Sequence, residues 1–386
     1  MNILLLNGEN VQTICAAKSL RKIGCNVIVM SSSKLSSGYF TRYRNKRYIA
    51  PSIISDFEGF KEYLMRFLSS TNIDVIIPMG DDSASFLSKY KHQIESNYKI
   101  RCAVTDWEVF KKASDKQSLM QLCETFGFPH PRTRGVNYDN LEIVSQYVGF
   151  PAMIKPNISA GAKGITKVNT LDELEAKLPD IIKDFGDCTL QQYIEQPPYY
   201  YNVMIHRSHS GDITASTIIK ISRYFPLKGG TSCYCQTIEN EALLKICCDI
   251  LEKLNWEGFA DFDILEDLCT KEYKVIEINP RVPSSLQASV AAGVDFMRLI
   301  LADLYGEPIP RFEYQTSKEI RWLGLDVMWF IFSKERFNFK PSWFNFWGKN
   351  VSYQDGSISD PMPMIIGCIA GVLKYLNPKF RKSKLK

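Results

Sequence analysis

A pair of apolar strands that carry acids, between residues 258 and 281, constrains this chain more than any other feature. Residues two apart on a strand point to the same side, so the second strand turns Glu277, Asn279 and Arg281 toward one face. Asp263 joins them from the neighbouring strand of the hairpin. Apolar neighbours imply that this face is buried, and a buried carboxylate needs a partner or a metal. The pattern therefore predicts a sheet whose polar face binds a cation.

Oxygen ligands beside one guanidinium suit Mg²⁺ (or Mn²⁺), because hard cations take oxygen donors and usually share them with the phosphates of a nucleotide. We predict Asp263, Glu277 and Asn279 as metal ligands, and Arg281 as a catalytic cation. The alternative is a pair of ordinary strands whose acids face solvent.

The strand 276–281, followed by the small-residue segment 284–293, resembles the metal-binding end of the ATP-grasp superfamily, in its carbamoyl-phosphate-synthase-like branch of carboxylate–amine ligases. The resemblance covers roughly residues 70 to 310 and rests on several motifs in the same order. It implies a fold that combines α/β and α+β parts. These parts are an N-terminal parallel-sheet pre-ATP-grasp domain (1–112), a two-lobed ATP-grasp domain (113–312, with a lid subdomain at about 130–192) and an aromatic-rich C-terminal extension (313–386).

Composition is that of a globular enzyme, with 45% hydrophobic and 23% charged residues. The net charge of +5 is misleading, because six Lys/Arg and no acid lie in residues 374–386, and the rest of the chain is close to neutral. We predict no nucleic-acid partner. Eleven cysteines without a CxxC pair, and no export signal, favour reduced thiols and a cytoplasmic location. The four histidines argue against a histidine-based zinc site or catalytic triad.

Residues 1 to about 112 alternate strand and helix patterns, which favours a parallel sheet. Helices are expected at about 11–23 and 57–69. A later strand leads into Asp81 and Asp82, which either begin the next helix or contact a substrate at the end of the sheet.

The sequence around Lys116 has two interpretations. Ser114 is predicted to cap a helix, with Gln117 completing a capping box. The resemblance implies in addition that Lys116 reaches the phosphates of the nucleotide.

Lys155 lies within the apolar strand 149–156, where a lysine is costly unless its ammonium meets an anion such as a phosphate. Small residues follow at 157–165 and would let backbone N–H groups close over phosphates. The resemblance implies that this segment is a mobile lid, with Lys163 as a weaker phosphate contact. The predicted nucleotide contacts here are Lys155, Ser159, Gly161 and Gly164.

Residues 189–195 read as a strand that leads into a linker, and in similar proteins this segment joins the two lobes and pairs with adenine. Gln191 occupies the place of a glutamate that commonly accepts the adenine amino group, and an amide oxygen can do the same. The acid that binds ribose in the family is missing. The predicted contacts are Gln191, Gln192, Tyr193, Ile194 and Glu195, with Glu195 as a substitute for the missing acid.

The basic, glycine-rich stretch 223–232 is predicted as a loop. The resemblance implies that it lies over the reacting groups, with Arg223 and Lys228 stabilising negative charge, and a solvated loop is the alternative. The preceding residues alternate like a hairpin from 201 to 221, and His206 near its turn is expected at the surface.

The resemblance implies an ATP-dependent ligase that joins a small-molecule carboxylate to an amine (or thiol) through an acyl phosphate and forms ADP. The alternative is an ATP-grasp-like protein that binds ATP without ligase activity, in a regulatory or structural role. Carbamoyl-phosphate synthase itself is disfavoured by length, and biotin-dependent carboxylation by the lack of a biotinyl segment. The sequence identifies neither substrate and does not determine whether the protein forms an oligomer.

Aromatic residues dominate the region from 312 to 347, and an apolar stretch at 364–376 precedes the basic tail. This stretch is shorter than the roughly 20 residues that a spanning helix requires. It predicts either a helix packed on the body or an interfacial helix whose lysines meet anionic lipid, with peripheral membrane contact through 361–386.

Overall fold

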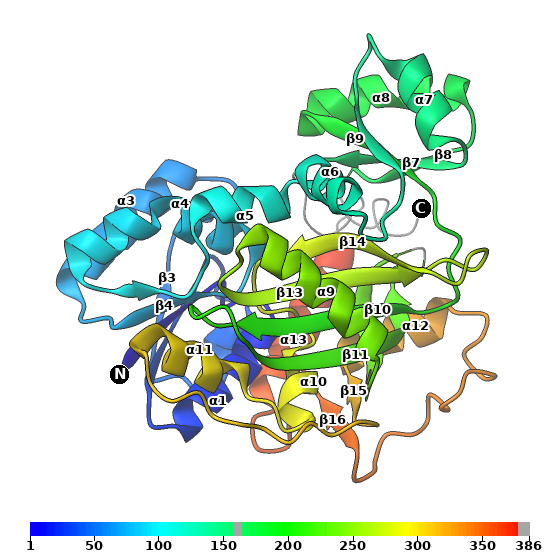
Figure 1. Cartoon of the computed structure of the whole chain (residues 1–386). Coiled ribbons are helices and arrows are strands. Elements are labelled where there is room, and N and C mark those ends of the chain that lie inside the picture. Colours follow the sequence, from blue (N-terminus) through cyan, green and yellow to red (C-terminus); the bar gives the residue numbers. More distant parts are fainter. Residues whose placement is uncertain (158–163, 228, 377–386) are drawn as a thin grey trace.

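Three sheets organise the residues that the computed structural model describes, which are 1–157, 164–227 and 229–376 (Figure 1). A five-stranded sheet lies near the N-terminus, a four-stranded sheet stands apart from the rest, and a seven-stranded sheet forms the centre. Helices and sheets are both present, and the N-terminal sheet is parallel, as the sequence predicts.

The N-terminal sheet has the strand order β3-β2-β1-β4-β5 and is parallel throughout. Alternate residues of β1 enter two different cores: Ile3 and Leu5 pack with α1, and Leu4 and Leu6 pack with α3 and α4. This two-sided burial explains why the strand is apolar at every position from Ile3 to Leu6. The elements are β1 (Asn2–Leu6), α1 (Gln12–Lys22), β2 (Asn26–Ser31), α2 (Ser37–Phe40), β3 (Lys46–Ile49), α3 (Phe57–Ser70), β4 (Val75–Pro78), α4 (Asp81–Tyr98) and β5 (Arg101–Cys102).

The four-stranded sheet has the order β6-β9-β7-β8 and is antiparallel, with α7 and α8 packed against it. In Figure 1, α6 lies between this sheet and β14 of the central sheet. The elements are α5 (Trp107–Ser114), α6 (Lys116–Phe126), β6 (Thr133–Val136), α7 (Leu141–Val148), β7 (Ala152–Pro156), β8 (Thr166–Val168), α8 (Leu171–Phe185) and β9 (Cys188–Gln192).

The cap of α6 differs from the sequence prediction. Ser114 is the last residue of α5, and Asp115 caps α6 by accepting a hydrogen bond from the N–H of Ser118. Asp115 has an extended backbone that separates the two helices, and its charge favours a helix N-terminus. The capping box with Gln117 was therefore wrong by one residue.

The central sheet has the order β14-β13-β10-β11-β12-β15-β16, antiparallel except between β15 and β16. The predicted hairpin is β10–β11. Strands β15 and β16 continue the sheet across the predicted boundary at residue 312, and the domain limits stay a prediction. The elements are β10 (Tyr200–Arg207), β11 (Ile213–Phe225), β12 (Thr231–Ile238), α9 (Glu241–Leu254), β13 (Gly258–Glu266), β14 (Tyr273–Asn279), α10 (Leu286–Ala291), α11 (Phe296–Tyr305), β15 (Glu319–Arg321), α12 (Leu323–Phe332), β16 (Val351–Tyr353) and α13 (Met362–Leu376).

His206, which was expected at the surface, and Arg223, which was predicted in a loop over the reacting groups, both lie in this sheet. His206 lies in β10, is 1% exposed, and is flanked by β11 and β13. Arg223 lies in β11, which continues to Phe225, so the predicted loop begins later. The guanidinium of Arg223 is 1% exposed and binds both carboxylate oxygens of Asp326 on α12, at 2.7 and 2.8 Å.

No helix within the described ranges combines the length and the apolar character that crossing a bilayer requires.

Candidate active site

The predicted metal ligands share one face of the β13–β14 hairpin. Asp263 lies opposite Glu277 in the register, and Asp261 lies opposite Asn279. The Nδ2 atom of Asn279 is 3.4 Å from both Asp261 Oδ2 and Asp263 Oδ2. Asn202, on the neighbouring strand β10, donates a hydrogen bond of 2.9 Å to Asp263. The hairpin thus gathers carboxylate and amide oxygens on a half-buried surface.

This face favours a positive charge. Burial, followed by the charge of Glu277, raises the pKa of Asp263 well above its usual range. Burial also raises the pKa of Asp261 to about 7. The buried Oδ1 atom of Asn202 accepts no hydrogen bond from the described residues. Crowded carboxylates and an unused amide oxygen fit a hard cation.

The described residues contain no group of three or more His, Cys, Asp or Glu side chains that could hold a metal by themselves. The predicted set, Asp263, Glu277 and Asn279, has two carboxylates and one amide. Such a set suits an ion that takes its remaining ligands from phosphates and water.

Two buried lysines approach these acids from other elements. Lys116, the first residue of α6, is 5% exposed, and its Nζ lies 3.7 Å from Glu277 Oε2. Lys155 on β7 is 8% exposed and donates a hydrogen bond of 2.5 Å to Gln191 Oε1. Burial lowers the pKa of Lys155 to about 8, although the nearby charge of Glu277 acts in the opposite direction. Cations from α6 and the four-stranded sheet therefore face anions of the central sheet.

Residues 193–199 connect β9 of the four-stranded sheet to β10 of the central sheet. Gln191, just before this linker, is 2% exposed, and its Nε2 donates to Thr133 Oγ1 at 3.0 Å. Its amide oxygen, which was predicted to meet adenine, is bound here by Lys155. Gln192 is half-buried, and its Oε1 accepts from the backbone N–H of Arg132.

The side chains of the linker residues Tyr193, Ile194 and Glu195 differ in exposure and in their contacts. The ring of Tyr193 lies 3.5 Å from the ammonium of Lys167. Ile194 is buried, whereas Glu195 is exposed and its carbonyl accepts from the N–H of Leu268. The exposed carboxylate of Glu195 leaves its predicted contact with ribose a prediction.

The structure describes only part of the predicted lid, which includes Gly164. Gly164 has φ +74° and a backbone so close to Pro156 that a Cβ would lie 2.7 Å from its ring. Only glycine fits that position without strain. Ser159, Gly161, Lys163 and Lys228 lie outside the described residues.

Arg281 links the hairpin to the N-terminal sheet. Its Nε donates to Asp81 Oδ1 at 2.8 Å, and its Nη2 donates to Asn279 Oδ1 at 3.2 Å. A second carboxylate, Asp261, lies 3.9 Å from Nη1. Asp81 is the first residue of α4, so it begins a helix and pairs with Arg281 at the same time.

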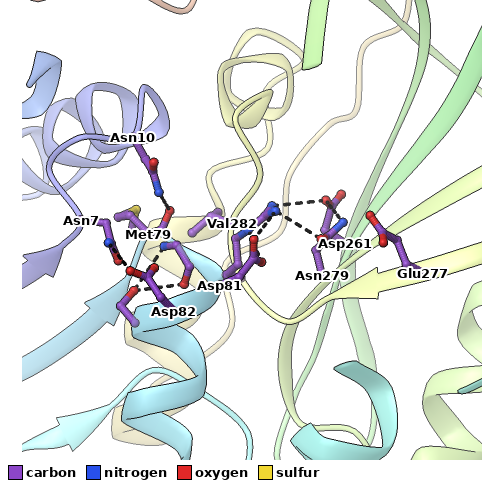
Figure 2. A network of polar contacts seen from close by, with 12 residues as sticks. Asn7, Asn10, Met79, Asp81, Asp82, Asp261, Glu277, Asn279 and Val282 are labelled. Carbon is purple, nitrogen blue, oxygen red and sulfur yellow. Dashed lines mark hydrogen bonds and ion pairs between the residues drawn. The ribbon is translucent and has the colours of Figure 1, made fainter. Parts of the chain in front are cut away.

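The loops after β1 and β4 meet beside Asp81 (Figure 2). Asn10 and Gln12 both donate hydrogen bonds of 2.6 Å to the carbonyl of Met79, and Gln12 reaches Val282 O at 3.2 Å. The strand order reverses between β1 and β4, and open parallel sheets bind ligands at such a point. A polar surface therefore continues from the hairpin acids to the N-terminal sheet.

Sequence reasoning missed two members of this site. Asp261 lies two residues before Asp263, so strand alternation could have found it. Asn202 reaches the site through the β10–β13 register, which no local pattern indicates.

Comparisons with known proteins agree with this geometry. The "ATP-grasp domain" family matches residues 113–285. A D-aspartate ligase from Enterococcus faecium is 24% identical over 300 residues, which cover 69% of this chain and 68% of that protein. A carbamoyl phosphate synthase large chain from Methanothermobacter thermautotrophicus is 23% identical over 79% of this chain, which spans only 29% of that protein.

A solved structure shares the fold. The biotin carboxylase domain dimer of 2-oxoglutarate carboxylase from Hydrogenobacter thermophilus, in complex with MgADP, ADP and bicarbonate, superposes with a TM-score of 0.67 at 14% identity. The match covers 82% of this chain and 73% of that one. The match to the family at residues 113–285, which includes the paired acid strands, shows that this chain carries an ATP-grasp domain.

Proposed function

We propose that this protein is an ATP-dependent ligase that joins a small-molecule carboxylate to an amine and forms ADP and phosphate. The observation that carries the proposal is the convergence of Lys116 on α6 and Lys155 on β7 toward Asp263 and Glu277. Phosphoryl transfer needs positioning and charge neutralisation, which such a set supplies. The ligases among the similar proteins support the same reaction class.

Each residue has a separate role in this proposal. Lys155 and Lys116 bind the phosphates of ATP, and Arg281 stabilises charge on the transferred group. Asp263, Glu277 and Asn279 would hold Mg²⁺, which neutralises phosphate charge when bound. The polar surface at Asp81 lies next to Arg281 and is the proposed place of the second substrate.

The proposed reaction has two steps. A carboxylate oxygen attacks the γ-phosphorus, and the bond to the bridging oxygen of ADP breaks. The amine nitrogen then attacks the acyl carbon of the acyl phosphate, inorganic phosphate leaves, and the amine loses a proton to solvent. A thiol would react in the same way.

The cysteines support a reducing location. All eleven are free, and eight of them are buried. Free thiols persist where glutathione keeps them reduced, so we place the proposed reaction in the cytoplasm.

Nucleotide binding is tested first, by thermal shift with Mg-ATP, Mg-ADP and AMP. We expect magnesium-dependent stabilisation by ATP and ADP that Lys155→Ala abolishes, because that variant removes a buried phosphate contact. Lys183→Ala, an exposed lysine on α8, is the matched control. No shift in the wild-type protein with any nucleotide would contradict the proposal.

Ligation is tested by trapping the acyl phosphate. With ATP, Mg²⁺ and a panel of amino acids and other carboxylates, hydroxylamine should convert the intermediate to a hydroxamate. A second candidate, ATP binding without ligation, is favoured by the engaged amide of Gln191 and the exposed Glu195. Nucleotide stabilisation without hydroxamate or phosphate release from any carboxylate would favour this candidate.

A further inference from the structure

Helix α13 (Met362–Leu376) exposes an apolar face. Its inner side packs against α2, with Ile366 only 9% exposed, and Gly367 passes close to Ser37. Its outer side is also apolar, at positions three or four apart. The outward residues are Met362, Ile365, Ile369, Val372, Leu373 and Leu376, each between 42% and 68% exposed. Packing inside the chain therefore explains one side of the helix and leaves the other without a partner among the described residues.

A basic segment borders this helix. Residues 31–50 contain five Lys/Arg and no acid. The segment is tied to the start of α13, because Arg42 donates from its side chain to Ser359 O and from its backbone to Asp360. Within the described part of the chain, none of the five pairs with a carboxylate. They are Lys34, Arg42, Arg44, Lys46 and Arg47, of which all but Arg44 are exposed.

The last turn of α13 and the sequence after it add to this charge. Residues 374–386 carry six Lys/Arg and no acid. At 15 residues, α13 is about 22 Å long. The hydrocarbon core of a bilayer is about 30 Å thick, so the helix suits the plane of an interface and not a span.

We infer that α13 docks on an anionic lipid surface, with its outer face in the interface and the basic residues of 34–47, together with Lys374, against the headgroups. An apolar face and a set of basic residues together give the two signals that stable peripheral binding needs. A second copy on the same face would bring these cations against each other. This inference goes beyond ligation and assigns the protein a place on a membrane.

The first test is co-sedimentation of the full chain with phosphatidylcholine vesicles, with and without phosphatidylglycerol. We expect binding only with the anionic lipid, weakened by salt. I365Q/I369Q/V372Q should lose binding more than tenfold, and I143Q/I213Q/L268Q, which changes exposed apolar residues elsewhere, should not. K34Q/K46Q/R47Q should weaken binding by about fivefold per charge removed, with K112Q/K183Q/K253Q as its control.

A second test uses the unaltered protein, so it does not depend on a variant folding. Cys368 on α13 and Cys269 in the β13–β14 turn are the two exposed cysteines. Anionic vesicles should slow maleimide alkylation of Cys368 several-fold and leave Cys269 unchanged, as measured by mass spectrometry.

Several outcomes would overturn the inference. These are absence of vesicle binding, equal binding to both lipid compositions, and equal alkylation of Cys368 with and without vesicles. Protection of Cys368 by higher protein concentration alone, or by an acidic protein in place of lipid, would assign the face to protein contact. Nucleotide-induced stabilisation is measured separately. It tests the ligase proposal alone, so failure of that proposal can be distinguished from failure of the membrane inference.

Discussion

Glu277 connects the predicted metal ligands to the two buried lysines. It lies opposite Asp263 on the neighbouring strand, and its Oε2 atom lies 3.7 Å from Nζ of Lys116. It also opposes the effect of burial on the pKa of Lys155. One carboxylate thus balances two lysines while it crowds another acid.

We expect Glu277→Gln to lower ATP-dependent phosphate release by at least about 100-fold, the order seen when one charge-stabilising group is removed. The amide keeps the shape of the side chain but loses the charge that would bind Mg²⁺. Steady-state phosphate release measures the effect. Glu272→Gln, an exposed acid in the same hairpin, is the control. Normal turnover by the Glu277 variant would refute its role.

His206 makes stability depend on pH. Burial lowers its pKa to about 4, from an ordinary value of 6.5. Below pH 6.5 the unfolded chain takes up a proton that the folded chain does not, so stability present above that pH is lost as pH falls toward 4. Between pH 7 and 5 the loss from this residue is ~2 kcal/mol.

Urea unfolding at pH 7 and 5 checks this effect. His206→Asn keeps a polar partner for Thr214 and should lose less stability over that range than the wild-type protein. His92→Asn, at an exposed histidine on α4, should behave like the wild-type protein. Equal pH dependence in the wild type and the His206 variant would contradict the assignment.

At the scale of elements, α12 is held to the central sheet by charge. Asp326 binds Arg223 on β11 and also accepts from Arg321 on β15, at 2.8 Å, and all three are at most 1% exposed. The carboxylate of Asp326 lies between two buried guanidinium groups and is their counter-charge. No other acid among the described residues forms an ion pair with either arginine. The extension after residue 312 is therefore part of the folded sheet and not an appendage.

We expect Asp326→Asn to destabilise the protein by ~3–5 kcal/mol, because it leaves buried guanidinium groups without a counter-charge. Thermal denaturation of the variant measures the loss. Asp139→Asn, at an exposed position, is the control and should change little. A loss below ~1 kcal/mol would mean that solvent reaches the arginines.

Periodicity predicted the elements that have one buried face. It placed α1 and α3 to within one residue, and alternation found the face of Glu277 and Asn279. Periodicity failed where contact with a residue far away in the sequence determines the position of a side chain. Arg223 reads as a loop residue until Asp326, 103 positions later, covers it. Likewise, no local pattern indicates that Asp81 meets Arg281, 200 positions away, because docking of two sheets brings them together.

At the scale of the whole molecule, the N-terminal sheet and the central sheet share one apolar core, and polar contacts also join them. Gln12 reaches Val282, Ser19 donates to Asp295 at 2.5 Å, and Arg281 pairs with Asp81. These contacts hold the loops after β1 and β4 against the hairpin that carries the acids. The proposed second substrate would therefore meet two sheets that are already fixed relative to each other.

A double-mutant cycle with Asp81→Asn and Arg281→Gln tests this docking. We expect a coupling energy of ~0.5–3 kcal/mol in unfolding experiments, because the pair is bidentate and partly buried. The exposed pair Lys245–Asp249 provides the control cycle, with ~0–1 kcal/mol. Additive effects at Asp81 and Arg281 would show that the contact does not hold the sheets together.

The strand order of the central sheet has a consequence for synthesis on the ribosome. β12 pairs with β15, which is translated about 80 residues later. At about 5–20 residues per second, β12 waits roughly 4–16 s for its neighbour. During that interval the nascent chain presents an open strand edge, and Arg223 lacks its carboxylate partner. The emerging polypeptide is thus exposed to wrong strand pairing at β12 until Glu319–Arg321 leave the ribosome, and a chaperone would be of use during that interval.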